Sequence, residues 1–214
     1  MPLSDLTLAY VAERMSTVKD EVVECVCAPC NNGWMQNLDS SFAGTIERWV
    51  RGGTHRLGPT GVAVVRRYLL KVMWVRLLGE QWSQGAIRNG ELIAEVVLNP
   101  RFGASIRGND MSEVSNHLSM GAAKVGASTC FTHAGFTPRV AGVGHRAGLR
   151  RFSGGLVVAL PKLELQLWLI YRFTPTMRTS WPAGISWLAA GSRFDRLGIA
   201  PAQPLVDHVE LAMG

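Results

Sequence analysis

Residues 27–50 read CAPCNNGWMQNLDSSFAGTIERWV, and this stretch joins a cysteine pair directly to an amphipathic segment. Cys27 and Cys30 have the C-x2-C spacing that lets two thiolates face one metal ion. Cys25 adds a third sulfur just upstream. The stretch therefore predicts a zinc knuckle, a tight turn that presents cysteine thiolates to one metal ion, followed by a helix. Cys25, Cys27 and Cys30 are the candidate ligands of a structural Zn ion.

The segment after the cysteines is predicted to be helical. Its apolar residues recur every three to four positions, which places them on one helical face. These residues are Trp34, Leu38, Phe42, Ile46 and Trp49. Asn31 or Asn32 is expected to cap the start of this helix by accepting a free backbone N–H, and Gly52-Gly53 to end it.

The same stretch resembles the second half of the zinc-binding core in bacterial and phage HNH-endonuclease-like proteins. The matching run is Cys27-x2-Cys30-Asn31-Asn32-Gly33-Trp34-Met35-x2-Leu38-Asp39. The resemblance implies a partial treble-clef fold in which Cys27 and Cys30 are the second pair of structural zinc ligands. It also implies that Asn31, directly after the last cysteine, helps to hold a catalytic divalent metal.

Two parts of the HNH pattern are missing from the sequence. No His precedes His55 and no Cys precedes Cys25, so the general-base His and the first cysteine pair are absent. Hydrolysis by an HNH site needs a base that activates water and a metal that holds the scissile phosphate. We therefore expect a degenerate or N-terminally truncated HNH-like endonuclease that binds nucleic acid with weak or no cleavage, unless a partner chain completes the site.

Asp39 is the second candidate catalytic residue. It follows Asn32 by seven residues, close to two helical turns, so the two side chains fall in one stripe. Their oxygen atoms are ligands that suit Mg or Mn ions. The alternative interpretation is a helix cap at Asn32 and a solvated Asp39. A second half-site at Cys130 and His133 is disfavoured, because residues three apart on a strand face opposite sides.

The net charge of +6 is concentrated in two parts of the chain. Residues 139–196 hold nine Lys or Arg against two acidic residues, and residues 45–76 hold seven against Glu47. Such clusters predict DNA or RNA binding, because basic side chains that face phosphates release counterions. The candidate contacts are Arg48, Arg51, Arg66, Arg67, Arg146, Arg150 and Arg151. The alternatives are an ordinary solvated surface, or a non-catalytic protein-interaction module that uses a basic sheet.

The overall pattern predicts an α+β fold: the knuckle and helices first, then a mainly antiparallel β-sheet with a closing helix. Residues 1–53 and 54–214 are the expected units, or one continuous domain. Helices are expected at residues 4–18, 59–78, 91–98 and 204–213, and strands at 22–26, 102–107, 127–133, 155–160 and 163–173. Residues 108–126 are expected to be irregular or weakly helical.

Two finer expectations concern side chains. In the strand 163–173 the odd-numbered leucines share one face, and Trp168 and Ile170 lie on the other, which we expect a helix to cover in part. Lys71 interrupts an apolar helical segment and is interpreted as a side chain whose ammonium group extends to solvent, with a phosphate contact as the alternative.

Composition excludes several classes of protein. The apolar stretches are interrupted by charged residues, so no membrane span is predicted, and no signal peptide precedes them. Three of the four cysteines are clustered, which favours a reducing cytoplasm over a disulfide framework. No Walker loop, dinucleotide fingerprint or G-x-S-x-G motif is present.

Overall fold

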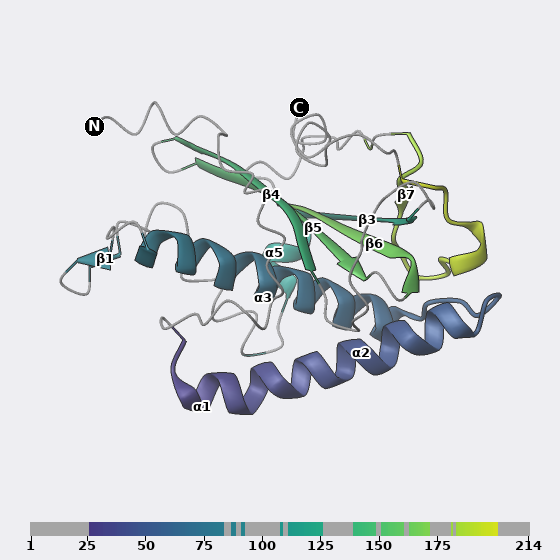
Figure 1. Ribbon diagram of the computed structural model, residues 1–214, viewed down its shortest axis with the longest axis horizontal. Helices are drawn as coiled ribbons and strands as arrows, with labels where there is room; N and C mark the ends of the chain where they lie inside the picture. The colour runs from purple at the N-terminus through teal and green to yellow at the C-terminus, as the bar shows by residue number, and fades with distance from the viewer. Residues whose placement is uncertain are drawn as a thin grey trace.

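The computed structural model describes residues 26–83, 87–88, 91–92, 108, 111–125, 139–148, 151–160, 163–171, 181 and 183–200. Its helical elements are α1 (Ala28–Cys30), η2 (Asn31–Met35), α2 (Gln36–Arg51), α3 (Pro59–Ser83), α5 (Ser112–Ser115) and η5 (Phe194–Arg196). Its strands are β1 (Ile87–Arg88), β2 (Glu91–Leu92), β3 (Leu118–Lys124), β4 (Arg139–Gly148), β5 (Arg151–Leu160), β6 (Leu165–Tyr171) and β7 (Ser186–Trp187). The predicted α+β class is confirmed (Figure 1).

The predicted helix after the cysteines is confirmed; a separate helical turn, α1, precedes it, and the backbone is non-helical between them at Gly33, with φ −104° and ψ −110°. Cys27 occupies the N-cap position of α1, so the prediction that Asn31 or Asn32 caps the helix is wrong. A proline in the first turn favours α1, because its fixed φ suits that position and its missing N–H is not needed there. The helix ends at Gly52, as expected, where the Gly52 N–H donates to the Arg48 carbonyl at 3.0 Å.

The apolar stripe of α2 packs against α3, and α3 lies between α2 and the sheet (Figure 1). Phe42 of α2 stacks on Tyr68 of α3, with ring centroids 3.6 Å apart and an interplanar angle of 6°. The helix α3 begins at Pro59, as expected, but it runs beyond residue 78 to Ser83. Gly79 does not end it, because one glycine inside a helix costs only about 1 kcal/mol.

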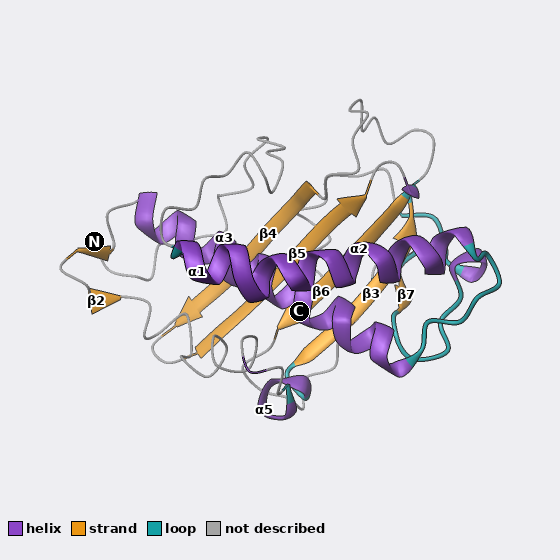
Figure 2. Cartoon of the chain, turned by 90° about the horizontal axis from the view of Figure 1, so that it is seen from below, coloured by secondary structure: helices purple, strands orange, loops and turns teal. Residues whose placement is uncertain are grey.

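Five of the described strands form one antiparallel sheet in the order β4-β5-β6-β3-β7. The helices cover one of its faces (Figure 2). β5 and β6 confirm the strands predicted at 155–160 and 163–173, and they pair as a hairpin with Leu160 opposite Leu165. β3 lies within residues 108–126, where the expectation of irregular or weakly helical structure is wrong beyond α5. The strand β2 starts at Glu91, where a helix was expected.

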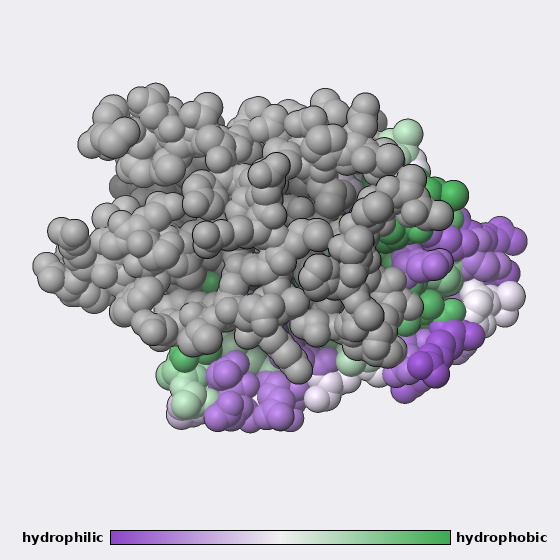
Figure 3. Space-filling view, viewed as in Figure 1, coloured by the Kyte–Doolittle hydropathy of each residue, from purple (hydrophilic) through white to green (hydrophobic). Residues whose placement is uncertain are grey.

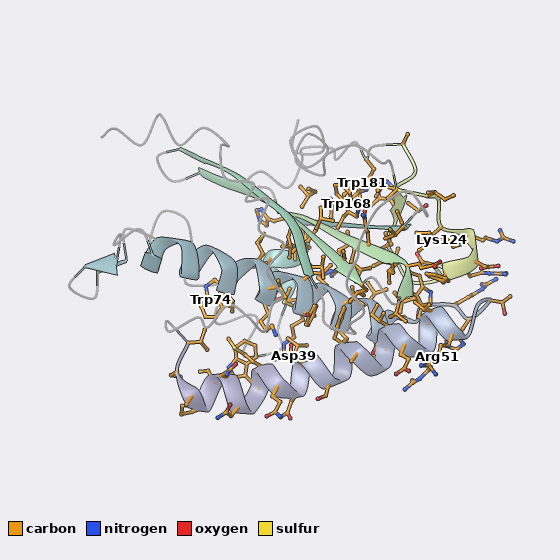
Figure 4. All side chains as sticks on the ribbon, viewed as in Figure 1. Asp39, Arg51, Trp74, Lys124, Trp168 and Trp181 are labelled. Atoms are coloured by element: carbon orange, nitrogen blue, oxygen red, sulfur yellow. The ribbon has the colours of Figure 1, made fainter. Side chains whose placement is uncertain are left out.

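The two faces of β6 differ as the alternation predicts. Leu165, Leu167 and Leu169 join α2 and α3 in one large core, which contains residues from both sides of the expected boundary at residue 53. Trp168 and Ile170 belong to a second cluster on the other face, away from the helices (Figure 4). Within the described residues this cluster is covered by Trp181 and by parts of residues 185–200, and partial cover by a helix stays a prediction.

Several predicted elements lie outside the described residues. They are the helices at 4–18 and 204–213, the strands at 102–107 and 127–133, and most of the strand at 22–26. Cys25, Cys130, His133 and Arg150 are outside the described residues as well. The treble-clef arrangement stays a prediction, because its upstream part would precede Cys27. In the described part of the chain, no helix has both the length and the apolar character required to span a membrane.

Candidate functional site

The two described cysteines lie at the start of the helical layer. Cys27 is exposed, Cys30 is half-buried, and neither forms a disulfide. Among the described residues, no three His, Cys, Asp or Glu side chains lie close enough together to hold a metal ion. A structural zinc site normally has four ligands, so the described donors fit only half of one. The assignment of zinc to Cys25, Cys27 and Cys30 therefore stays a prediction.

The candidate catalytic residues lie on successive parts of the same helical run. Asn31 and Asn32 are exposed in η2. The Asp39 carboxylate points toward α3 (Figure 4), where its Oδ1 atom is paired with the ammonium group of Lys71. The side chain of Asp39 is 50% exposed, and that of Lys71 only 7%. One carboxylate oxygen is thus engaged inside the protein, although the side chain still reaches solvent.

This contact corrects the interpretation of Lys71. Its ammonium group does not extend to solvent; it lies between Asp39 and the face of the Tyr68 ring, 4.9 Å from the ring centroid. The acidic partner on the neighbouring helix compensates the charge, so that the lysine can remain buried. Burial, followed by the negative charge of Asp39, raises the pKa of Tyr68 well above its ordinary value. Tyr68 is therefore a neutral packing residue at physiological pH.

The predicted nucleic-acid contacts whose side chains are described lie in two places, on α3 and at the end of α2. Arg66 and Arg67 are half-buried on α3; the Arg66 Nη1 donates to the Ser115 hydroxyl at 3.1 Å, and the Arg67 guanidinium lies 5.8 Å from the Trp34 ring centroid. Burial lowers the pKa of both arginines. Arg146 and Arg151 have their backbones in β4 and β5, and their side chains are outside the described set.

Arg48 and Arg51 lie at the end of α2, and two adjoining pockets open near this end of the molecule. The first, about 290 Å³, is the helix-end pocket; it is lined by Thr45, Arg48, Trp49, His55, Arg56, Leu57, Gly58, Thr60 and Gly61. The second, about 380 Å³, is the arginine pocket; it is lined by Arg56, Ser186, Trp187, Gly191, Ser192, Arg193, Arg196 and Leu197. Arg56 lines both pockets.

Backbone contacts hold the two walls of the arginine pocket together. Arg56 and Arg193 form an isolated antiparallel bridge. Next to it, the Leu57 N–H donates to the Ser192 carbonyl and the Gly191 N–H donates to the Leu57 carbonyl, each at 2.8 Å. Trp49 belongs to α2 and is buried in the protein core, and its indole N–H also donates to the Ser192 carbonyl at 3.0 Å. The pocket is therefore anchored to α2.

Only some of the positive charges at this end are compensated. Arg51 pairs with Glu47 at 2.7 Å, and Arg193 forms two bonds to Asp195, at 3.0 and 2.5 Å. The hydrogen bonds between Arg193 and Asp195 raise the pKa of the guanidinium and lower that of the carboxyl. Among the described residues, Arg48, Arg56 and Arg196 are exposed and form no ion pair, although the charge of Arg196 helps to lower the pKa of Asp195.

The surface of this end is mixed in character. In the space-filling view, strongly hydrophilic and hydrophobic residues lie side by side at the end where α2 finishes (Figure 3). Arg51 and Lys124 lie at this end as well (Figure 4). Sequence reasoning missed Arg56, Arg193 and Arg196 as site residues. All three belong to the two basic segments of the sequence, and that charge clustering was the only signal that pointed to them.

The comparisons with known proteins add no family to these observations. The chain matches no protein-family model, and no match was found among curated proteins or solved structures. The HNH resemblance therefore rests on the run from Cys27 to Asp39 alone.

Proposed function

We propose that this protein binds nucleic acid through the helix-end and arginine pockets and that its HNH-like site is degenerate. The observation that carries the proposal is the convergence of Arg48, Arg56 and Arg196, which form no ion pair among the described residues, from two distant basic segments onto one end of the molecule. Guanidinium groups bind phosphate oxygens through several donors at once, and exposed ones release counterions from a polyanion.

The N-terminus of α3 supports this assignment of the site. Thr60 and Gly61, in the first turn of α3, line the helix-end pocket beside Arg48 and Arg56. The backbone N–H groups of a first helical turn have no partners within the helix, and they favour a negative charge. The end of the molecule that holds the two pockets is therefore expected to attract anions through both arginine side chains and backbone N–H groups.

Binding without cleavage is the expected behaviour. One carboxylate oxygen of Asp39 is paired with Lys71 and is therefore less available to a metal ion. The described residues include only two cysteines, which is half of the usual set of zinc ligands. A missing general base typically lowers the rate of hydrolysis on the order of 10²- to 10⁴-fold. The proposed function is therefore recognition of the phosphate backbone by a protein that retains part of an HNH-like scaffold.

The proposal is tested by fluorescence anisotropy with labelled oligonucleotides at several salt concentrations. The wild-type chain is expected to bind at low salt, with an affinity that falls steeply as salt rises. Arg56→Ala and Arg196→Ala are each expected to weaken binding several-fold and to reduce the salt slope by about one. Arg67→Ala is the matched control, since Arg67 lies against Trp34 outside both pockets.

Two results would contradict the proposal. The first is a wild-type chain that binds no oligonucleotide at low salt. The second is a loss of affinity in Arg67→Ala as large as in Arg56→Ala, which would show that the two pockets are not the binding surface.

A further inference from the structure

Trp187 is 56% exposed and lines the arginine pocket together with Arg56 and Arg196. A tryptophan side chain loses a large hydrophobic stabilisation when it stays in solvent, and most are largely buried. Ile199, the other strongly exposed large apolar residue among those described, does not line the pocket. An exposed indole beside guanidinium groups therefore calls for a ligand with both an aromatic face and a negative charge.

The indole of Trp187 is held by neighbouring rings and by its backbone. It packs edge-on against Trp181, with centroids 5.5 Å apart at 85°, and Trp181 packs in the same way against the buried Trp168, at 6.4 Å and 82°. Its backbone pairs with Gly121 of β3. A side chain at Gly121 would come within 2.7 Å of Ile185 and 3.2 Å of Trp181, so the glycine leaves room for this packing.

The geometry points to single-stranded DNA or RNA as the ligand, an inference that rests on the proposed function. We infer that one base stacks on Trp187 while the adjoining phosphate lies in the arginine pocket between Arg56 and Arg196. Bases in a duplex are already stacked on their neighbours, whereas an unpaired base can leave the stack and pack on an aromatic side chain. DNA and RNA share this chemistry, and they differ at the 2′-hydroxyl.

The test uses the full chain and three labelled probes: a 16-nucleotide oligo(dT), an oligo(rU) of the same length, and a duplex of matched length. Trp187→Ala is expected to weaken binding to both single strands on the order of tenfold and binding to the duplex much less, because stacking contributes only where bases are unpaired. Ile199→Ala is the matched control, since it removes an equally exposed apolar side chain outside the pocket lining; it is expected to bind all probes like wild type.

A second measurement does not depend on the alanine variant. Tryptophan fluorescence of the wild-type chain is expected to be quenched by oligo(dT), and Trp187→Phe is expected to lose much of that quenching while it still binds by anisotropy, because phenylalanine also stacks. An unequal affinity for oligo(dT) and oligo(rU) identifies the preferred strand.

Three outcomes overturn the inference. Single-strand binding unaffected by Trp187→Ala excludes stacking at this residue. An equal loss for single strands and duplex assigns Trp187 a part in shaping the pocket instead. A wild-type chain that binds the duplex and not the single strands overturns the inference and leaves the proposed function standing, whereas a chain that binds none of the probes overturns both.

Discussion

The ammonium group of Lys71 on α3 is paired with the carboxylate of Asp39 on α2, and only Asp39 reaches solvent. The packing of the two helices places residue 39 opposite residue 71, just as it places Phe42 opposite Tyr68. The pair gives Asp39 a definite structural role, because removing it would leave a positive charge in the core without compensation. The structural role does not test the catalytic role of Asp39, which stays a prediction.

Asp39→Asn is expected to lower the free energy of unfolding by about 1.5–3 kcal/mol, the usual range for a hydrogen bond to a charged group. Urea unfolding followed by circular dichroism measures this change. Adding Lys71→Met is expected to restore part of the loss, because methionine has a similar shape and no charge. Glu47→Gln, which removes the exposed pair with Arg51, is the control and is expected to cost less than about 0.5 kcal/mol. Equal losses for the two acidic residues would contradict the structural role of Asp39.

Tyr68 is expected to make the protein sensitive to alkaline pH. Burial, and then the charge of Asp39, raise the pKa of Tyr68 in the folded state, while an unfolded tyrosine ionises near pH 10. The contribution of the neutral Tyr68 is therefore complete below about pH 10 and is lost progressively as the pH rises above it, because the unfolded chain releases the proton first. Tyr68→Phe is expected to show a smaller fall in the free energy of unfolding between pH 9 and 11. Identical pH slopes for the two proteins would argue against this.

Gln166 lies on β6 in the core with its side chain fully buried, and neither amide atom has a hydrogen-bond partner in the described part of the chain. An unsatisfied buried amide costs about 1–3 kcal/mol. Gln166→Met, which keeps the length of the side chain, is therefore expected to raise the midpoint of urea unfolding. An unchanged or lowered midpoint would indicate that the amide is satisfied after all.

Two glycines are expected to respond to alanine in opposite ways. Gly184 has φ +88°, and a Cβ atom there would lie 2.0 Å from the Ile199 carbonyl oxygen, so Gly184→Ala is expected to destabilise the fold by more than about 2 kcal/mol. Gly44 is exposed on α2 with open space around its Cα, and Gly44→Ala is expected to stabilise the protein by about 0.5–1 kcal/mol. Thermal unfolding of the two variants checks both signs, and a shift in the same direction for both would be inconsistent with the described backbone.

Metal content and cleavage form a linked prediction. Cys27 and Cys30 are two ligands of a site that usually needs four, so the purified chain is expected to hold well under one zinc ion by elemental analysis. It is also expected not to cut plasmid DNA with Mg²⁺, Mn²⁺ or Ni²⁺. Stoichiometric zinc, or metal-dependent cleavage abolished by Asn31→Ala or Asp39→Ala, would show that the HNH-like site is intact.

The sequence predicted the elements whose pattern is strong. The apolar residues of α2 keep a helical period, and the alternating leucines of β6 keep a period of two, so both were identified correctly. The strand β3 was missed because its sequence, LSMGAAK, contains none of the β-branched or aromatic residues that favour strands. Its strand form follows from pairing with β6 and β7 on either side, which is a long-range effect.

The candidate site was harder to predict for the same reason. The charge of the two basic segments was evident, but Arg56 meets Arg193 only because the backbone around Leu57 pairs with that around Ser192. Arg66 and Arg67 have the same composition signal as Arg56, yet helix packing turns them toward Ser115 and Trp34. Composition showed that positive charge was present, and tertiary structure decided which arginines share a surface.

The bridge between Arg56 and Arg193 also determines when the arginine pocket can exist. Its two walls are separated in the sequence by α3 and by every strand from β1 to β7. Closing so long a loop is entropically costly, so contacts of this kind form after the local helices and hairpins. During synthesis, Arg193 leaves the ribosome after all of these strands. We therefore expect a ligand to bind the pocket only after residues 186–197 have been synthesised and have packed against Arg56.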